Sequence, residues 1–172
     1  LVDIERPSGT ACRDWKVATA LPLARGERGA ARPYGFGVYR AADYDELIDH
    51  PVEMGNFTLG HFEAAGVHHD IVLTGRHDCD LERLAEDLGR VCEWQVALFG
   101  APPPMDYYVF LTMVVGEGYG GLEHRASTAL LCSRADLPWK GMDTSTEGLP
   151  AGYKTFLGLC SHEYFHSWNV KR

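Results

Sequence analysis

The segment that most constrains the fold is Tyr107–Val115, an almost uninterrupted apolar run that is rich in aromatic and β-branched residues. Successive side chains of a β-strand point to opposite faces of its sheet. A strand without alternation between polar and apolar residues must therefore be covered on both faces. We predict a fully buried strand over these residues.

A long amphipathic helix is predicted just before this strand, over residues 80–99. Its apolar residues recur at spacings of three and four, Asp80 is a candidate N-cap, and a glycine and several prolines follow the helix. Further upstream, residues 56–64 and 67–73 are predicted strands, joined by a hairpin turn at Ala65–Gly66. These elements favour an α+β fold, in which a mixed or antiparallel sheet packs on helices.

Weaker patterns describe the two ends of the chain. Residues 1–24 have the composition of strand material, and the Gly- and Arg-rich run 25–37 is predicted to be a loop. A short helix is predicted over 43–49, with an Asp cap. After a glycine-rich loop, residues 122–132 are a predicted strand, and a final helix begins near Gly152.

The final helix carries the pattern H-E-x-x-H, formed by His162, Glu163 and His166. Residues i and i+4 share one face of a helix, so both imidazoles can reach one ion. Neutral imidazole is a good zinc ligand, and a catalytic zinc keeps one position open for water. The carboxylate of Glu163, next to the first histidine, can accept a proton from water at the metal. These residues are candidates for a metal pair and a catalytic base.

The same three residues also occur by chance in helices that bind no metal, and histidine in a helix is more often structural. The surrounding apolar residues predict that the helix is packed, so we expect both histidines to face inward, where an unpaired imidazole is costly. A catalytic zinc usually takes three protein ligands, and the motif supplies two. A non-catalytic interaction domain therefore stays an alternative.

The segment His162–Arg172, His-Glu-Tyr-Phe-His-Ser-Trp-Asn-Val-Lys-Arg, closely resembles the active-site helix of the glycyl aminopeptidase family. These are zinc peptidases of the thermolysin-like gluzincin group. Gly120–Ser127 is similar to the substrate-binding strand of that family. The segment Asp43–Gly55 also resembles the family. The resemblance covers most of the chain from about Trp15 onward, and the final segment is its most discriminating part.

The resemblance implies a thermolysin-like N-terminal catalytic subdomain with the H-E-x-x-H helix as its last element. Residues 1–24 would be remnant strands of a preceding β domain or an N-terminal extension, and residues 25–172 the N-terminal part of a truncated catalytic domain. The third zinc ligand, a glutamate, would lie on a later helix beyond Arg172, as would a catalytic tyrosine and a PDZ-like domain. This chain alone should then bind Zn²⁺ weakly or not at all and be inactive.

The implied activity is hydrolysis of N-terminal peptide bonds, after small residues such as Gly or Ala, in peptides with a free N-terminus. Gly120 and Gly121 lack a Cβ and would let a peptide backbone come close. Glu123 would bind the terminal ammonium group; without the resemblance, it would be taken as an exposed strand residue. Asn169 is a candidate for supporting the ligands from outside the metal's immediate contacts. An endopeptidase would use the same helix without Glu123.

A rival interpretation uses the pattern G-x-G-x-x-G formed by Gly116, Gly118 and Gly121, which follows a predicted buried strand. This is the dinucleotide fingerprint, and Asp136 stands at about the separation of the ribose-binding acid. The fingerprint requires a helix after the last glycine. The segment after Gly121 has no clean helical face, and Glu123 would bring negative charge to the phosphates. A dinucleotide-binding oxidoreductase is therefore the less favoured alternative.

Composition limits the remaining classes. Net charge is −8 and there is no cluster of basic residues, which argues against nucleic acid as a partner. No run of eighteen apolar residues occurs, so no membrane span is predicted. The five cysteines form no C-x-x-C pair, and their number mildly favours a reducing, cytoplasmic compartment. The chain starts without methionine or a signal pattern, which suggests a piece of a longer protein.

Overall fold

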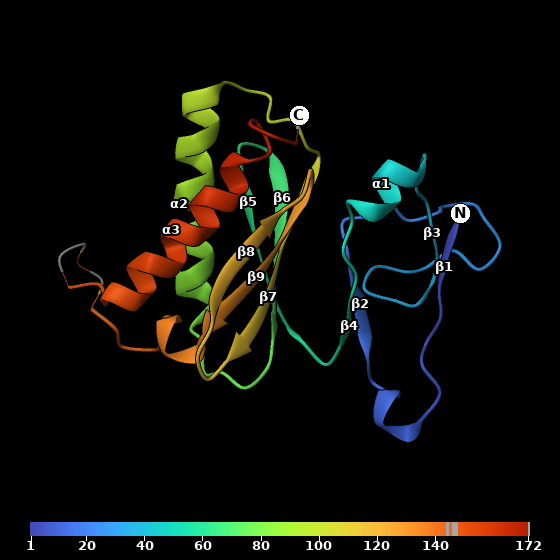
Figure 1. Cartoon of the computed structure of the whole chain (residues 1–172), viewed down its shortest axis with the longest axis horizontal. Helices are drawn as coiled ribbons and strands as arrows, with labels where there is room; N and C mark the ends of the chain where they lie inside the picture. The colour runs from blue at the N-terminus through green and yellow to red at the C-terminus, as the bar shows by residue number, and fades with distance from the viewer. Residues whose placement is uncertain (144, 146–147, 172) are drawn as a thin grey trace.

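The computed structural model describes residues 1–143, 145 and 148–171, which form two adjacent lobes (Figure 1). The N-terminal lobe contains four short strands and the short helix α1. The second lobe contains a five-stranded sheet with helices α2 and α3 on one face. None of the helices within the described residues is long and apolar enough to cross a membrane.

In the N-terminal lobe two pairs of antiparallel strands surround a small apolar cluster. The elements are β1 (Val2–Ile4) with β3 (Gly37–Tyr39), β2 (Lys16–Ala18) with β4 (Glu53–Gly55), the 3₁₀ turn η1 (Thr10–Cys12) and α1 (Tyr44–Ile48). As predicted, Asp43 caps α1, because its side chain accepts a hydrogen bond from the Glu46 N–H. Strand pairing joins residues before and after 24 in this lobe. The domain division at residue 24 stays a prediction.

The second lobe is built on a mixed sheet with the strand order β5-β6-β7-β9-β8. Its strands are β5 (Thr58–Ala64), β6 (Val67–Thr74), β7 (Tyr107–Val115), β8 (Tyr119–Glu123) and β9 (Ser127–Ser133). The central strand β7 runs parallel to β6 and β9, whereas the β5–β6 and β8–β9 pairs are antiparallel. The predicted α+β class with a mixed sheet is confirmed.

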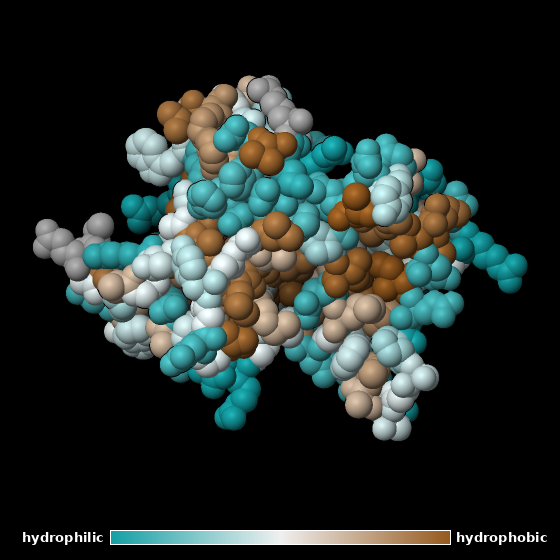
Figure 2. Space-filling model, in the orientation of Figure 1, coloured by the Kyte–Doolittle hydropathy of each residue, from teal (hydrophilic) through white to brown (hydrophobic). Residues whose placement is uncertain are grey.

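Strand β7 is covered on both faces, as its apolar sequence predicts. Tyr108 and Phe110 are buried against the helices, whereas Val109 and Leu111 pack with Phe57 and residues around β2. The N-terminal lobe therefore covers the face of the sheet that the helices leave open. Figure 2 shows apolar side chains gathered over the junction of the two lobes, where a cavity of about 640 Å³ opens.

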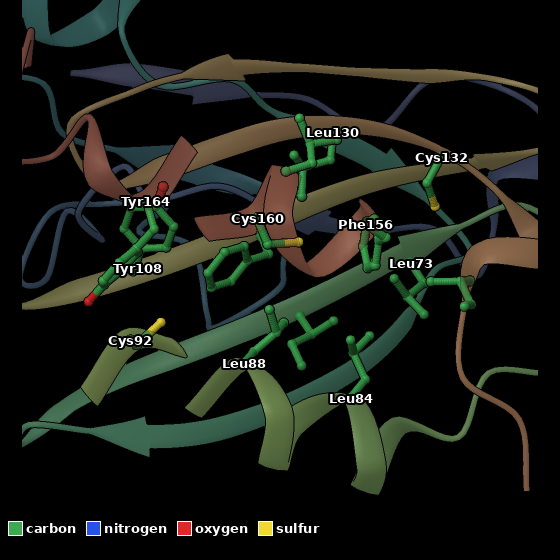
Figure 3. Close-up of a cluster of buried hydrophobic side chains, with 14 of the residues drawn as sticks. Leu73, Leu84, Leu88, Cys92, Tyr108, Leu130, Cys132, Phe156, Cys160 and Tyr164 are labelled. Carbon is green, nitrogen blue, oxygen red and sulfur yellow. The ribbon is translucent and has the colours of Figure 1, made fainter. Parts of the chain in front are cut away.

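Helices α2 (Leu81–Phe99) and α3 (Ala151–Phe165) pack together on the other face, and the 3₁₀ turn η2 (Arg134–Asp136) precedes α3. Figure 3 shows Leu84, Leu88 and Cys92 of α2 facing residues of α3 and the sheet. Burying one such leucine stabilises a fold by about 1.5–3 kcal/mol. The Asp80 side chain caps α2 by accepting from the Arg83 N–H. This core fixes α3 against the sheet.

A buried carboxylate joins the lobes behind the sheet. Asp70, on β6, is fully buried, and its Oδ2 accepts hydrogen bonds from the hydroxyls of Tyr34 (2.8 Å) and Tyr107 (2.6 Å). Its Oδ1 lies 2.9 Å from Nε2 of His68. Tyr34 belongs to the N-terminal lobe and has a left-handed backbone conformation, with φ of 58°. These contacts satisfy a charge that would otherwise be costly to bury.

One predicted element is wrong. The segment predicted as a single strand, residues 122–132, instead belongs to two antiparallel strands, β8 and β9. The chain reverses between them, and the His124 N–H donates across this turn to the Ser127 carbonyl, 3.0 Å away. Strand β8 begins at Tyr119, so it includes part of the predicted glycine loop. The polar residues His124 and Arg125 occupy the turn, where both contact Asp49 outside the sheet.

Candidate active site

The two motif histidines lie together at the end of α3. Their Nε2 atoms are 3.2 Å apart, and the ring planes are nearly perpendicular, at 88°. Two nitrogens that bind one zinc ion tetrahedrally, at 2.0–2.1 Å each, are about 3.3–3.4 Å apart. The observed separation therefore fits a shared metal ion.

The expectation that both histidines face inward is wrong. His162 is exposed and His166 is half-buried. The buried side of the helix follows Phe156, Cys160 and Tyr164, which pack into the core beside the sheet (Figure 3). Because the histidines lie at the edge of this stripe, their rings remain accessible to a ligand.

Glu163 is the motif residue that faces inward. It is buried, and its Oε2 has no hydrogen-bond partner among the described residues. Burial raises the pKa of this carboxyl group, His162 and His166 oppose the rise, and Glu123 adds to it. An unpaired buried carboxylate oxygen is costly, so its presence beside two imidazoles indicates a site that binds something.

Strand β8 lies directly against this carboxylate. A Cβ built on Gly121 would lie 2.7 Å from Glu163 Cγ and even closer to the carboxylate, whereas a Cβ on Gly120 would meet nothing within 4 Å. The missing side chain of Gly121 therefore makes room for Glu163 itself. Gly120 faces open space, and its predicted contact with a substrate backbone stays a prediction.

Glu123, at the end of β8, reaches the same place. One ligand atom each of Glu123, Glu163 and His166 lies within 4.8 Å of the others, a grouping that can hold a cation. Glu123 and the motif are 40 residues apart in sequence, so the sheet and α3 bring them together. Its carboxylate lies where it can accept hydrogen bonds from an ammonium group or bind a metal ion.

Asn169 reaches the site through its backbone. Its side chain is exposed, while its carbonyl oxygen lies 3.1 Å from Nδ1 of His166. A carbonyl only accepts, so this hydrogen bond places the proton of a neutral His166 on Nδ1 and leaves the Nε2 lone pair free. Such a contact orients metal-binding histidines in many sites. The supporting role predicted for Asn169 stays a prediction, and the contact seen here is made by its main chain.

Comparisons with known proteins identify the family of this chain. The model of the peptidase M61 N-terminal domain matches residues 1–56, and the model of M61 glycyl aminopeptidase matches residues 155–172. A crystal structure of an aminopeptidase N family protein from Idiomarina loihiensis is 50% identical, with a TM-score of 0.83 over 91% of this chain. The chain belongs to the M61 glycyl aminopeptidase family. It covers 25% of the Idiomarina chain, and the comparison with curated proteins gives no match.

The membership and the fold together remove the dinucleotide alternative. That fingerprint needs a helix directly after Gly121, where the backbone amides bind phosphate. In this M61 chain Gly121 lies inside strand β8, with Glu163 packed on it. The glycine pattern serves strand packing.

A set of contacts beside the site was missed by the sequence analysis. Asp49, at the end of α1, accepts a hydrogen bond from Lys171 Nζ at 2.9 Å and from the Arg125 N–H at 2.9 Å. Nδ1 of His124 lies 3.4 Å from the same carboxylate. These partners are 75 to 122 residues away in sequence, and no local pattern marks such a contact.

Beneath the site, His69 supports α3 from the sheet. Its Nε2 lies 3.0 Å from the Tyr164 hydroxyl and its Nδ1 2.9 Å from the Val67 carbonyl, in a fully buried position. The ring stacks on Phe62. Burial lowers the pKa of His69 to about 4, so the ring is neutral near pH 7. It is a structural residue.

Proposed function

We propose that this chain is the N-terminal part of the catalytic region of a zinc-dependent aminopeptidase, with a thermolysin-like arrangement around α3. The proposed reaction hydrolyses the N-terminal peptide bond of peptides with a free N-terminus, after small residues such as Gly or Ala. The observation that carries the proposal is the convergence of the two Nε2 atoms, 3.2 Å apart, beside the unpaired carboxylate oxygen of Glu163.

His162 and His166 would hold the zinc ion. The resemblance to the family implies a third ligand, a glutamate beyond Arg172. The chemistry that a bound zinc ion supplies is that of a Lewis acid, which polarises the scissile carbonyl and lowers the pKa of water. The carbonyl of Asn169 would keep His166 in the tautomer that binds through Nε2.

Glu163 would act as the general base. Its buried Oε2 would take a proton from the attacking water and deliver it to the nitrogen of the leaving amine. Packing against Gly121 holds the carboxylate in place, so little reorganisation is needed during the reaction.

Glu123 would bind the terminal ammonium group of the substrate. One of its ligand atoms lies within 4.8 Å of a ligand atom each of Glu163 and His166, so an ammonium group bound there would lie next to the proposed base and metal ligand. Among the described strands, β8 is one of the two edge strands of the sheet, so its free edge can pair with an extended substrate. Gly120, with open space around it, would let that backbone approach.

The test uses the full-length natural protein and the variant Glu163→Gln. Turnover of alanyl-4-nitroanilide should fall by roughly 10²–10⁴-fold, because a general base contributes that much, while zinc content by mass spectrometry stays unchanged. Glu27→Gln, which removes the same charge from an exposed ion pair with Arg40, serves as the control. Full turnover by Glu163→Gln would refute the assignment. Faster cleavage of N-acetylated peptides than of free ones would identify an endopeptidase instead.

A further inference from the structure

The N-terminal lobe places one buried carboxylate beside the site. Asp49 follows α1, and its side chain is 10% exposed. A hollow of about 380 Å³ lies next to it, bounded by α1, the end of β8 and the segment after α3, with Glu123 in its wall. Carboxylates are rarely this buried unless partners satisfy them.

The carboxylate of Asp49 contacts two segments of the second lobe, the turn after β8 and the segment after α3. Oδ2 accepts from the Arg125 N–H, two residues after Glu123, at 2.9 Å. Oδ1 accepts from Nζ of Lys171 at 2.9 Å and lies 3.4 Å from Nδ1 of His124. One side chain therefore ties the end of β8 to the segment that follows the histidine helix.

The segment that contains Lys171 is itself tied to the site. The Lys171 N–H donates to the His166 carbonyl at 3.1 Å. To bring Lys171 back toward Asp49, the preceding Val170 adopts a φ of 91°, a conformation that costs free energy for a β-branched residue. A strained turn persists only where contacts hold it, and the ion pair with Asp49 is one of the contacts at this turn.

We infer that Asp49 is a positioning residue: from the N-terminal lobe, it fixes the distance between Glu123 and His166. This inference rests on the proposed function. The carboxylate touches no reacting group. It acts through the backbone of Arg125 on one side and through Lys171 on the other. The distance between the Glu123 carboxylate and the His166 imidazole is thus set partly by the N-terminal lobe, which contains neither residue.

A purely structural contact between lobes would behave differently, and the chain offers a matched control. The Tyr34 hydroxyl also joins the two lobes, by donating to Asp70 at 2.8 Å, but among the described residues it makes no hydrogen bond to β8 or to the segment after α3. Tyr34→Phe therefore weakens the junction without loosening the site. Lys171→Met removes the partner of Asp49, and Lys171→Arg keeps its charge.

The experiment compares the full-length wild-type protein with Asp49→Asn, Lys171→Met, Lys171→Arg and Tyr34→Phe. Hydrogen exchange at residues 119–127 and 166–171 should rise about tenfold in Asp49→Asn and Lys171→Met, because both lose the same tie. The kcat/KM for alanyl-4-nitroanilide should fall about tenfold in the same two variants, with a rise in KM from the loosened ammonium site. Lys171→Arg and Tyr34→Phe should stay within about twofold of wild type.

Unchanged exchange at both segments in Asp49→Asn and Lys171→Met would overturn the positioning role, as would an equal loss of activity in Tyr34→Phe. If Asp49→Asn does not fold, Lys171→Met alone decides between the two outcomes. An inactive wild-type protein would reject the proposed function, whereas the exchange data still decide whether Asp49 holds the two segments. The two failures are therefore distinguishable.

Discussion

Replacing Gly121 by alanine is the sharpest test of the site's packing. The new Cβ would lie 2.7 Å from Glu163 Cγ, so this atom would have to retreat about 0.7 Å to reach the ordinary contact distance of 3.4 Å. Glu163 cannot move away freely, because it is buried and its helix is fixed by the core around Cys160 and Tyr164. The clash therefore displaces the carboxylate or the strand.

Overpacking of this kind costs about 1–3 kcal/mol of stability. Displacing a catalytic group by about 1 Å costs on the order of 10²-fold in rate. Gly121→Ala should therefore reduce both the unfolding free energy and the kcat/KM of the full-length protein by these amounts. Urea denaturation and hydrolysis of alanyl-4-nitroanilide measure the two effects.

Gly120→Ala is the matched control, one residue away on the same strand. Its Cβ would meet no atom within 4 Å, so stability should be unchanged or rise by about 0.4–1 kcal/mol through the stiffer unfolded chain. If the two variants were equal in stability, the packing of Gly121 on Glu163 would be wrong.

The remaining predictions concern other parts of the chain. His69 has a pKa of about 4 when folded and about 6.5 when unfolded, so the unfolded state binds more protons between these values. The stability from this group is complete above pH 6.5 and falls by about 3 kcal/mol as the pH drops to 4; an NMR titration that shows protonation of His69 near pH 6.5 would contradict this. Asp43→Ala should cost about 1 kcal/mol in urea denaturation by removing the cap of α1, and an unchanged midpoint would argue against the cap. The 172-residue chain, with only His162 and His166 as imidazole ligands, should bind zinc weakly and hydrolyse nothing, which equilibrium dialysis and the nitroanilide assay measure.

Elements with local periodicity were predictable from the sequence. The helix 81–99, the strand 107–115 and the hairpin around Ala65–Gly66 each follow from side-chain spacing over a few residues. The reversal at 124–126 was missed, because residues 122–132 contain neither glycine nor proline, the strongest local signals of a turn. In the N-terminal lobe, β1 and β2 lie in the segment predicted as strand material, whereas β3 and β4 were missed, since strand pairing there joins residues up to about 40 apart in sequence.

The candidate site was likewise predictable only in part. The i, i+4 spacing of His162 and His166 places their rings together from local geometry alone. The contact of Gly121 with Glu163 and the tie from Asp49 depend on how α3 crosses β8 and how the lobes meet. Such contacts arise from tertiary packing, and no pattern within a short window of sequence encodes them.

The shared carboxylate of Asp70 has a consequence for how the molecule melts. Its hydroxyl donors come from both halves, so pulling the halves apart would strip a buried anion of the Tyr34 hydroxyl while Val109 and Leu111 lost their apolar cover. Unfolding of one lobe alone therefore costs free energy in two ways, through the lost hydrogen bond to Asp70 and through the exposed apolar surface. Heating should show one calorimetric peak, and a shortened chain beginning at residue 57 should lose cooperativity.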